Sequence, residues 1–160
     1  MLATASPLLH RSKTRTFNEE LWGQCQLLVP QARWEPFKLP YLIGKVLLAE
    51  PVGKVPVYLV DGALLNRVHD IGFVQGGNSV EDPKMPNPGK TKYFLVLDDR
   101  HCRHDLCFVL LHEAVELEVM VIEKLSYEEA HDTVANPAEQ HARLRGFDLL
   151  QDRKLLRIGP

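Results

Sequence analysis

The sequence lacks any long apolar run, and it contains few cysteines. No stretch approaches the roughly 20 apolar residues that a membrane-spanning helix needs, so we expect no membrane association. The three cysteines, Cys25, Cys102 and Cys107, form no C-x-x-C pair, and an odd number is unsuited to a disulfide framework. This usage is typical of a reducing compartment, so we predict a cytoplasmic protein.

The chain also lacks an excess of positive charge. Its formal net charge of -2 provides no basic field that would attract nucleic acid, so we expect no nucleic-acid partner. The glycine pair Gly76-Gly77 is not followed by G-K-[ST], which argues against a phosphate-binding loop and favours a turn or bulge. At 160 residues the chain fits one domain with a substantial core.

Acidic side chains are absent from the first 15 residues, which carry Arg11, Lys13 and Arg15. We predict that residues 1–15 form a flexible basic arm and that residues 16–160 form a single domain. A short organellar transit segment is the alternative for the arm, because such segments are also basic and poor in acidic residues.

A helix is predicted at the start of the domain, and strands after it. Thr16 followed by Glu19 forms a capping box for a helix over residues 17–28, and Pro30, Pro36 and Pro40 then predict extended chain. Strands are predicted from alternating and β-branched residues, and Asp61-Gly62 is typical of a tight turn. The predicted strands are 41–49, 55–60, 63–69, 71–77 and 92–99, with a turn at 51–53 and a surface loop over 78–89.

The C-terminal third is predicted to be helical. A long apolar helix covers residues 104–125, and Ser126 with Glu129 forms a second capping box that opens another helix at Tyr127. Asn136-Pro137 either interrupts this helix or restarts it with Pro137 in the first turn. The order of elements predicts an α+β domain, in which a mostly antiparallel sheet packs against the long helix and the helix after it.

Three polar side chains in the middle of the long helix carry the functional signal. His112, Glu113 and Glu116 lie in the apolar stretch CFVLLHEAVELEVMVIEKL, where unsatisfied polar groups are costly. His112 and Glu116 are four residues apart, so they share one face of the helix and can hold two corners of a divalent metal site. Glu113 is adjacent and could accept a proton from a metal-bound water.

The third metal ligand is expected from the next helix. His131 lies in YEEAHDTVA, close to the turn after the long helix, and a tight helix hairpin would bring it back towards Glu116. We therefore predict zinc as the cofactor, bound by His112, Glu116 and His131. Glu139 is the reserve ligand, with a direction that depends on how the chain continues through Asn136-Pro137.

These residues resemble a known group of metallopeptidases. The segments YFLVLDD and CFVLLHEAVE are similar to the strand and HE-bearing helix of zincins, particularly the small HExxH peptidase-like domains of phage and mobile-element proteins. A wider pattern, which includes LLHEAVELEVM and SYEEAHDTVANPAEQHAR, also resembles small uncharacterised bacterial and phage proteins with HELVE-type and Y-x-x-AH-type motifs. The resemblance covers residues 60–143 and implies a minimal zincin-like core. It implies His112 as first ligand, Glu113 as general base and Glu116 in the position of the second ligand.

The motif departs from the zincin pattern at one position. Glu116 stands where the second histidine is usual, so the motif reads HExxE, which makes the site more anionic and weakens its Lewis acidity. We therefore consider two functions: a metal-dependent, peptidase-like hydrolase, and a zincin-like interaction or regulatory protein that has lost its chemistry. Both imply a peptide or protein as substrate or partner.

A different enzyme class fits the carboxylates alone. Glu113 and Glu116 form an ExxE pair, and Glu129 and Asp132 an ExxD pair. Together they resemble the magnesium site of all-α nucleotide pyrophosphohydrolases, in which paired carboxylates hold Mg²⁺ through oxygen and water. The strand-rich region from Tyr41 to Asp98 argues against that fold.

Overall fold

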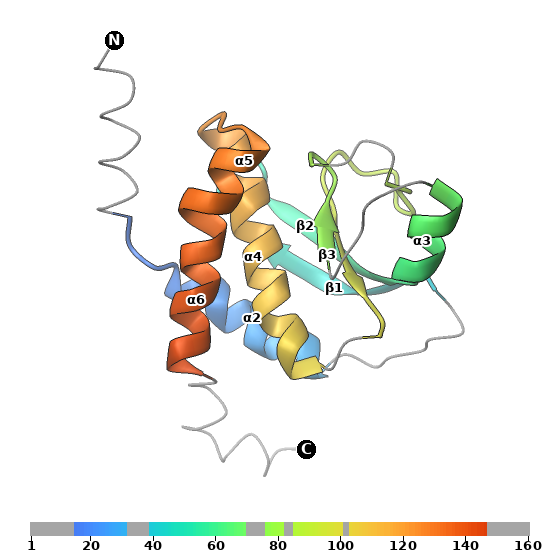
Figure 1. Ribbon diagram of the computed structural model, residues 1–160, viewed down its shortest axis with the longest axis horizontal. Helices are drawn as coiled ribbons and strands as arrows, with labels where there is room; N and C mark the ends of the chain where they lie inside the picture. Colours follow the sequence, from blue (N-terminus) through green and yellow to red (C-terminus); the bar gives the residue numbers. More distant parts are fainter. Residues whose placement is uncertain (1–14, 32–38, 70–75, 82–84, 101–102, 147–160) are drawn as a thin grey trace.

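A computed structural model describes residues 15–31, 39–69, 76–81, 85–100 and 103–146. It has the α+β architecture predicted from the sequence: a four-stranded sheet with helices on its faces (Figure 1). Residues 1–14 of the predicted arm lie outside the described residues. Arg15, the last residue of that arm, forms a two-pronged ion pair with Glu123, at 3.0 Å for each nitrogen–oxygen contact.

The first described helix, α2, begins two residues later than predicted. It spans Glu19–Gln31, and the Asn18 side chain caps it by accepting a hydrogen bond from the Leu21 amide at 3.0 Å. Asn18 therefore takes the capping role predicted for Thr16. The prediction of extended chain at Pro30 was also wrong, because Pro30 lies in the last turn of α2.

The sheet places β3 at one edge, beside the long helix. Its strands are β1 (Tyr41–Leu47), β2 (Lys54–Val60), β3 (Gly76–Asn78) and β4 (Leu95–Asp98), in the spatial order β1-β2-β4-β3. The outer pairs are antiparallel, as predicted, whereas β2 and β4 are parallel. A parallel pair needs a crossover, and part of that crossover is helical.

That helical part is α3, which spans Gly62–His69 where a returning strand was predicted. The Asp61 side chain accepts a hydrogen bond from the Leu64 amide at 3.0 Å, and the Asp61 carbonyl accepts one from the Leu65 amide at 3.1 Å. Asp61 thus starts a helix instead of a hairpin turn, and aspartate suits both roles. The predicted strand 71–77 is described only from Gly76 onward.

The two faces of the sheet bury two separate cores. Val57 and Leu59 of β2 point into the main core with the long helix α4 (Arg103–Ile122), whereas Tyr58 and Val60 point into a smaller core with Leu65 of α3. This alternation follows from the two-residue period of a strand. Figure 1 shows α4 and α6 (Asn136–Arg145) on one side of the sheet and α3 on the other. In the described part of the chain, no helix is both long and apolar enough to cross a membrane.

The helical C-terminal part runs on after α4 with a change of helix type. The predicted capping box is confirmed: Ser126 and Glu129 cap α5 (Tyr127–Ala130) reciprocally. A π-helical turn, η2 (His131–Ala135), follows directly, and α6 (Asn136–Arg145) continues it with Pro137 in its first turn. Asn136-Pro137 therefore neither interrupts nor restarts the helix, because the backbone stays helical from Ala135 into Asn136; only the position of Pro137 in a first helical turn is confirmed.

The edge strand β3 can approach α4 only because it begins with glycine. A Cβ atom at Gly76 would lie 2.7 Å from Cγ1 of Val109 and 3.2 Å from Cγ of Glu113. We expect Gly76→Ala to destabilise the protein by about 1–3 kcal/mol, because the strand would have to move away from the helix. Urea unfolding measures this change.

Gly23→Ala is the matched control, because a Cβ atom there meets no atom within 4 Å in the interior of α2. Alanine should stabilise that helix by up to about 1 kcal/mol. Equal stabilisation by both substitutions would contradict the close packing of β3 on α4.

Candidate metal centre

The structure brings His112, Glu116 and His131 together, as predicted. Nε2 of His112 lies 3.1 Å from Nδ1 of His131, which lies 3.0 Å from Oε2 of Glu116. The third side of the triangle, from His112 Nε2 to Glu116 Oε2, is 3.4 Å. Two ligands bound at about 2.1 Å to a tetrahedral ion lie about 3.4 Å apart, so this triangle has nearly the size that such an ion requires.

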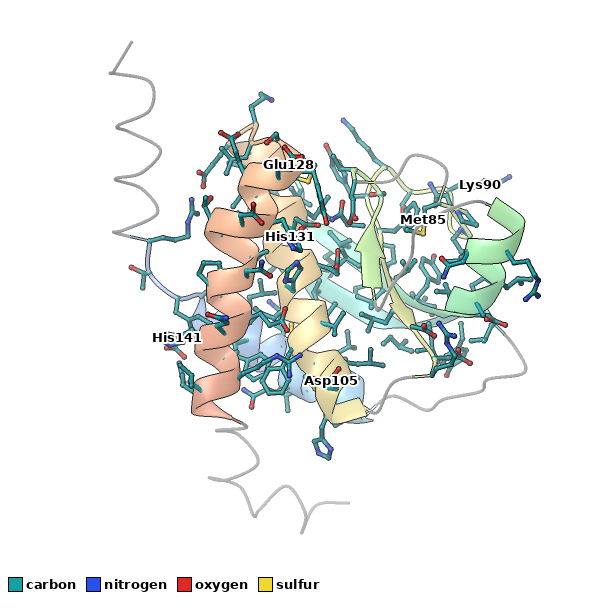
Figure 2. All side chains as sticks on the ribbon, in the orientation of Figure 1. Met85, Lys90, Asp105, Glu128, His131 and His141 are labelled. Carbon is teal, nitrogen blue, oxygen red and sulfur yellow. The ribbon has the colours of Figure 1, made fainter. Side chains whose placement is uncertain are left out.

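Hydrogen bonds alone satisfy this cluster poorly. His131 Nδ1 also lies 3.4 Å from the Tyr127 hydroxyl, which gives this atom three polar neighbours. A ring nitrogen carries at most one hydrogen, and that hydrogen cannot be directed at all of them. A single cation would instead satisfy both histidine nitrogens and the carboxylate oxygen at once. Figure 2 shows His131 on the side of its helix that faces α4.

Asn78, at the end of β3, fixes the orientation of the Glu116 carboxylate. Its side-chain nitrogen donates a 2.9 Å hydrogen bond to Oε1 of Glu116, which leaves Oε2 facing the two histidines. The Asn78 side-chain oxygen accepts hydrogen bonds from the amides of Val80 and Glu81 at 3.0 and 2.8 Å. Asn78 and Glu116 are both completely buried. The asparagine therefore leaves one glutamate oxygen, Oε2, available as a candidate metal ligand.

Glu113 lies beside the triangle in an environment that favours its neutral form. Burial raises the pKa of Glu113 well above its usual value, and the carboxylates of Glu116 and Glu81 raise it further. The Asn78 amide approaches Glu113 Oε1 at 3.4 Å, which is a weak contact. Glu113 can therefore hold a proton more readily than an exposed glutamate does, which suits a group that takes up a proton during a reaction.

Glu139, the reserve ligand of the sequence analysis, lies on the far side of His112. Its Oε1 is 2.9 Å from His112 Nδ1, the nitrogen that points away from the triangle. Burial by itself would lower the pKa of His112, but hydrogen bonds to Glu116 and Glu139 and the nearby Glu113 raise it to about 10. A metal ion would therefore have to displace a proton from His112 when it binds.

The π-helical turn explains how His131 and Glu139 both reach His112. In a regular α-helix, residues eight apart differ in direction by about 80°. In η2 the Asn136 amide donates to the carbonyl of His131, five residues earlier, so one turn takes up an extra residue. Glu139 therefore points nearly where a residue seven positions after His131 would point in a regular α-helix. The directions of the His131 and Glu139 side chains then agree to within about 20°.

Sequence reasoning named four residues that lie together at the candidate centre, and it missed the role of Asn78. His112, Glu113, Glu116 and His131 converge as predicted, and His131 supplies the third donor atom in preference to Glu139. Asn78 was placed in a surface loop, which was wrong, since it is a buried residue of β3. The one signal for it was the preceding glycine pair, because glycine in a strand marks close approach of another backbone or side chain.

The carboxylate pairs of the magnesium alternative do not meet. Glu129 accepts a hydrogen bond from the Ser126 amide at the start of α5, and Asp132 is exposed. The carboxylate that does approach Glu113 and Glu116 belongs to Glu81, after β3. The described residues therefore offer a mixed histidine and carboxylate centre, and no four-carboxylate site from ExxE and ExxD.

Comparisons with known proteins add no family to this geometry. No protein-family model, no curated protein and no solved structure matches the chain. The candidate His-Glu-His metal-binding group therefore rests on the arrangement of its own side chains.

Proposed function

We propose that the protein is a zinc-dependent, zincin-like hydrolase of peptide or protein substrates. His112, Glu116 and His131 would hold the ion, and Glu113 would act as general base. The single observation that carries the proposal is the triangle of His112 Nε2, His131 Nδ1 and Glu116 Oε2, with sides of 3.0 to 3.4 Å. The peptide class of substrate rests on the resemblance of the sequence to zincins.

The donor set fits zinc chemically. Two histidine nitrogens and one glutamate oxygen form the His₂Glu set that catalytic zinc sites use, with the fourth position left for water or substrate. Zinc in such a site lowers the pKa of its water to about 7 and polarises a substrate carbonyl. Replacement of the usual second histidine by Glu116 is therefore balanced here by His131, which restores a set with one anionic ligand.

The remaining steps belong to the side chains of the protein. Glu113 accepts a proton from the attacking water and returns it to the leaving nitrogen of the peptide bond. Its raised pKa brings it closer to the range in which it can do both at neutral pH. The Tyr127 hydroxyl stays protonated, because burial and the nearby carboxylates of Glu81 and Glu116 raise its pKa. Tyr127 can therefore donate a hydrogen bond to negative charge that develops on the substrate.

Zinc titration of the metal-free protein tests this proposal. We expect the wild-type protein to bind one zinc ion per chain, as measured by calorimetry and by elemental analysis after dialysis. His131→Ala should weaken binding strongly because it removes a donor nitrogen of the triangle. Glu116→Gln should do so because it removes the negative charge, and because Asn78 would hold the glutamine oxygen and leave the NH₂ group facing the histidines.

Asp132→Asn is the matched control, because Asp132 is the exposed neighbour of His131 on the same turn. It should bind zinc as the wild type does. A wild-type protein that binds no zinc, or a Glu116→Gln variant that binds it unchanged, would contradict the proposed centre.

A further inference from the structure

Three charged side chains form a chain that ends on His112. Asp105 lies 3.0 Å from NH1 of Arg143, and Nε of Arg143 donates a 2.7 Å hydrogen bond to Oε2 of Glu139. The other oxygen of Glu139 lies 2.9 Å from Nδ1 of His112. The guanidinium of Arg143 also lies over the Phe108 ring, 4.6 Å from its centroid. Residues of α4 and α6 are thereby joined from the first turn of α4 to the candidate metal centre.

Both oxygens of Glu139 are engaged in this chain, which argues against a role as metal ligand. Oε1 faces His112 and Oε2 faces Arg143, so neither is directed at the triangle of donor atoms.

The carboxylate of Glu139 lies beside Nδ1 of His112, and this contact determines which ring nitrogen is available to a metal ion. A carboxylate accepts a hydrogen bond, so the hydrogen of a neutral His112 is held on Nδ1. The lone pair is then on Nε2, the atom in the triangle with His131 and Glu116. The same contact fixes the rotation of the ring. In metal centres, such a carboxylate orients the histidine and makes it a stronger ligand.

We propose that Glu139 is a positioning residue for His112, and that Arg143 and Asp105 hold Glu139 in place. This inference rests on the proposed metal centre. The π-helical turn η2 makes the arrangement possible, because it places Glu139 and His131 on the same side of their helix. The positioning residue thus acts on metal affinity without touching the ion.

Titration with zinc and with cobalt tests the inference on the full chain. We expect Glu139→Ala to weaken binding of both ions about 10- to 100-fold and to change the visible absorption of bound cobalt, because the His112 ring is no longer fixed. Glu139→Gln should recover most of the affinity, since the glutamine oxygen can still accept the hydrogen from Nδ1. Arg143→Gln should weaken binding less than Glu139→Ala.

Arg145→Gln is the matched control, because it breaks a different ion pair of α6, the one with Glu19. It should leave affinity and the cobalt spectrum unchanged. Wild-type affinity in Glu139→Ala would overturn the inference while leaving the metal centre intact. A loss as large in Glu139→Gln as in Glu139→Ala would also overturn it. A wild-type protein that binds neither ion would instead show that the proposed centre itself is wrong.

Discussion

Chelation of zinc should lower the melting temperature of the wild-type protein and leave that of His112→Ala almost unchanged. A ligand present at about 1,000 times its Kd stabilises the native state by about 4 kcal/mol. For a chain of this length, that corresponds to a shift of roughly 8 to 16 °C. Thermal unfolding with and without chelator measures both values.

The effect should be large because buried carboxylates share the proposed centre. Glu113 and Glu116 are both buried, and the carboxylate of Glu116 is one cause of the raised pKa of Glu113. A divalent cation would neutralise these carboxylates, and it would bind only the folded arrangement, in which α4 and η2 meet.

His104→Ala is the matched control, because His104 is an exposed residue near the start of the same helix. This variant should respond to chelator as the wild type does. If the wild type responds no more than His112→Ala does, the contacts of the centre are hydrogen bonds in a polar network without an ion. The protein would then fit the alternative of a zincin-like interaction module.

Local sequence patterns predicted most of the elements correctly. The strand-forming runs became β1, β2 and β4, and the capping box at Ser126 is present. The errors occurred where one residue suits two local structures. Asp61 can start a turn or cap a helix, and tertiary packing of Leu65 into the smaller core favours the helix. Pro30 lies in the last turn of α2, so the hydrogen bond lost with its missing N–H is one at the end of the helix.

The candidate centre was predictable to the extent that helical periodicity determines it. His112 and Glu116 share a face because they are four residues apart, and the short connection brings His131 close to them. The position of Glu139 was not predictable, since it depends on a π-helical turn that no short motif announces. Asn78 comes from an edge strand distant in sequence, and only the pairing of β3 with β4 places it over Glu116.

A more demanding prediction concerns Glu113. We expect Glu113→Gln to reduce the rate of peptide hydrolysis by about 10²- to 10⁴-fold and to leave zinc binding unchanged. Glutamine has the shape of glutamate, and its oxygen can still accept the hydrogen bond from Asn78. It cannot accept a proton from water at neutral pH, however. The measurement is cleavage of a library of internally quenched fluorescent peptides by zinc-loaded protein, with zinc content determined on the same samples.

The contrast with Glu116→Gln makes this experiment decisive about roles. Glu116 offers Oε2 to the triangle, so its replacement should remove zinc and activity together. Glu113 faces the Asn78 amide and the carboxylates of Glu81 and Glu116, so its replacement should remove activity alone. A Glu113→Gln variant that loses zinc would identify Glu113 as a ligand. A zinc-loaded wild type that cleaves no peptide would be consistent with the metal centre. It would refute the proposed hydrolase activity and, with it, the role of Glu113 as general base.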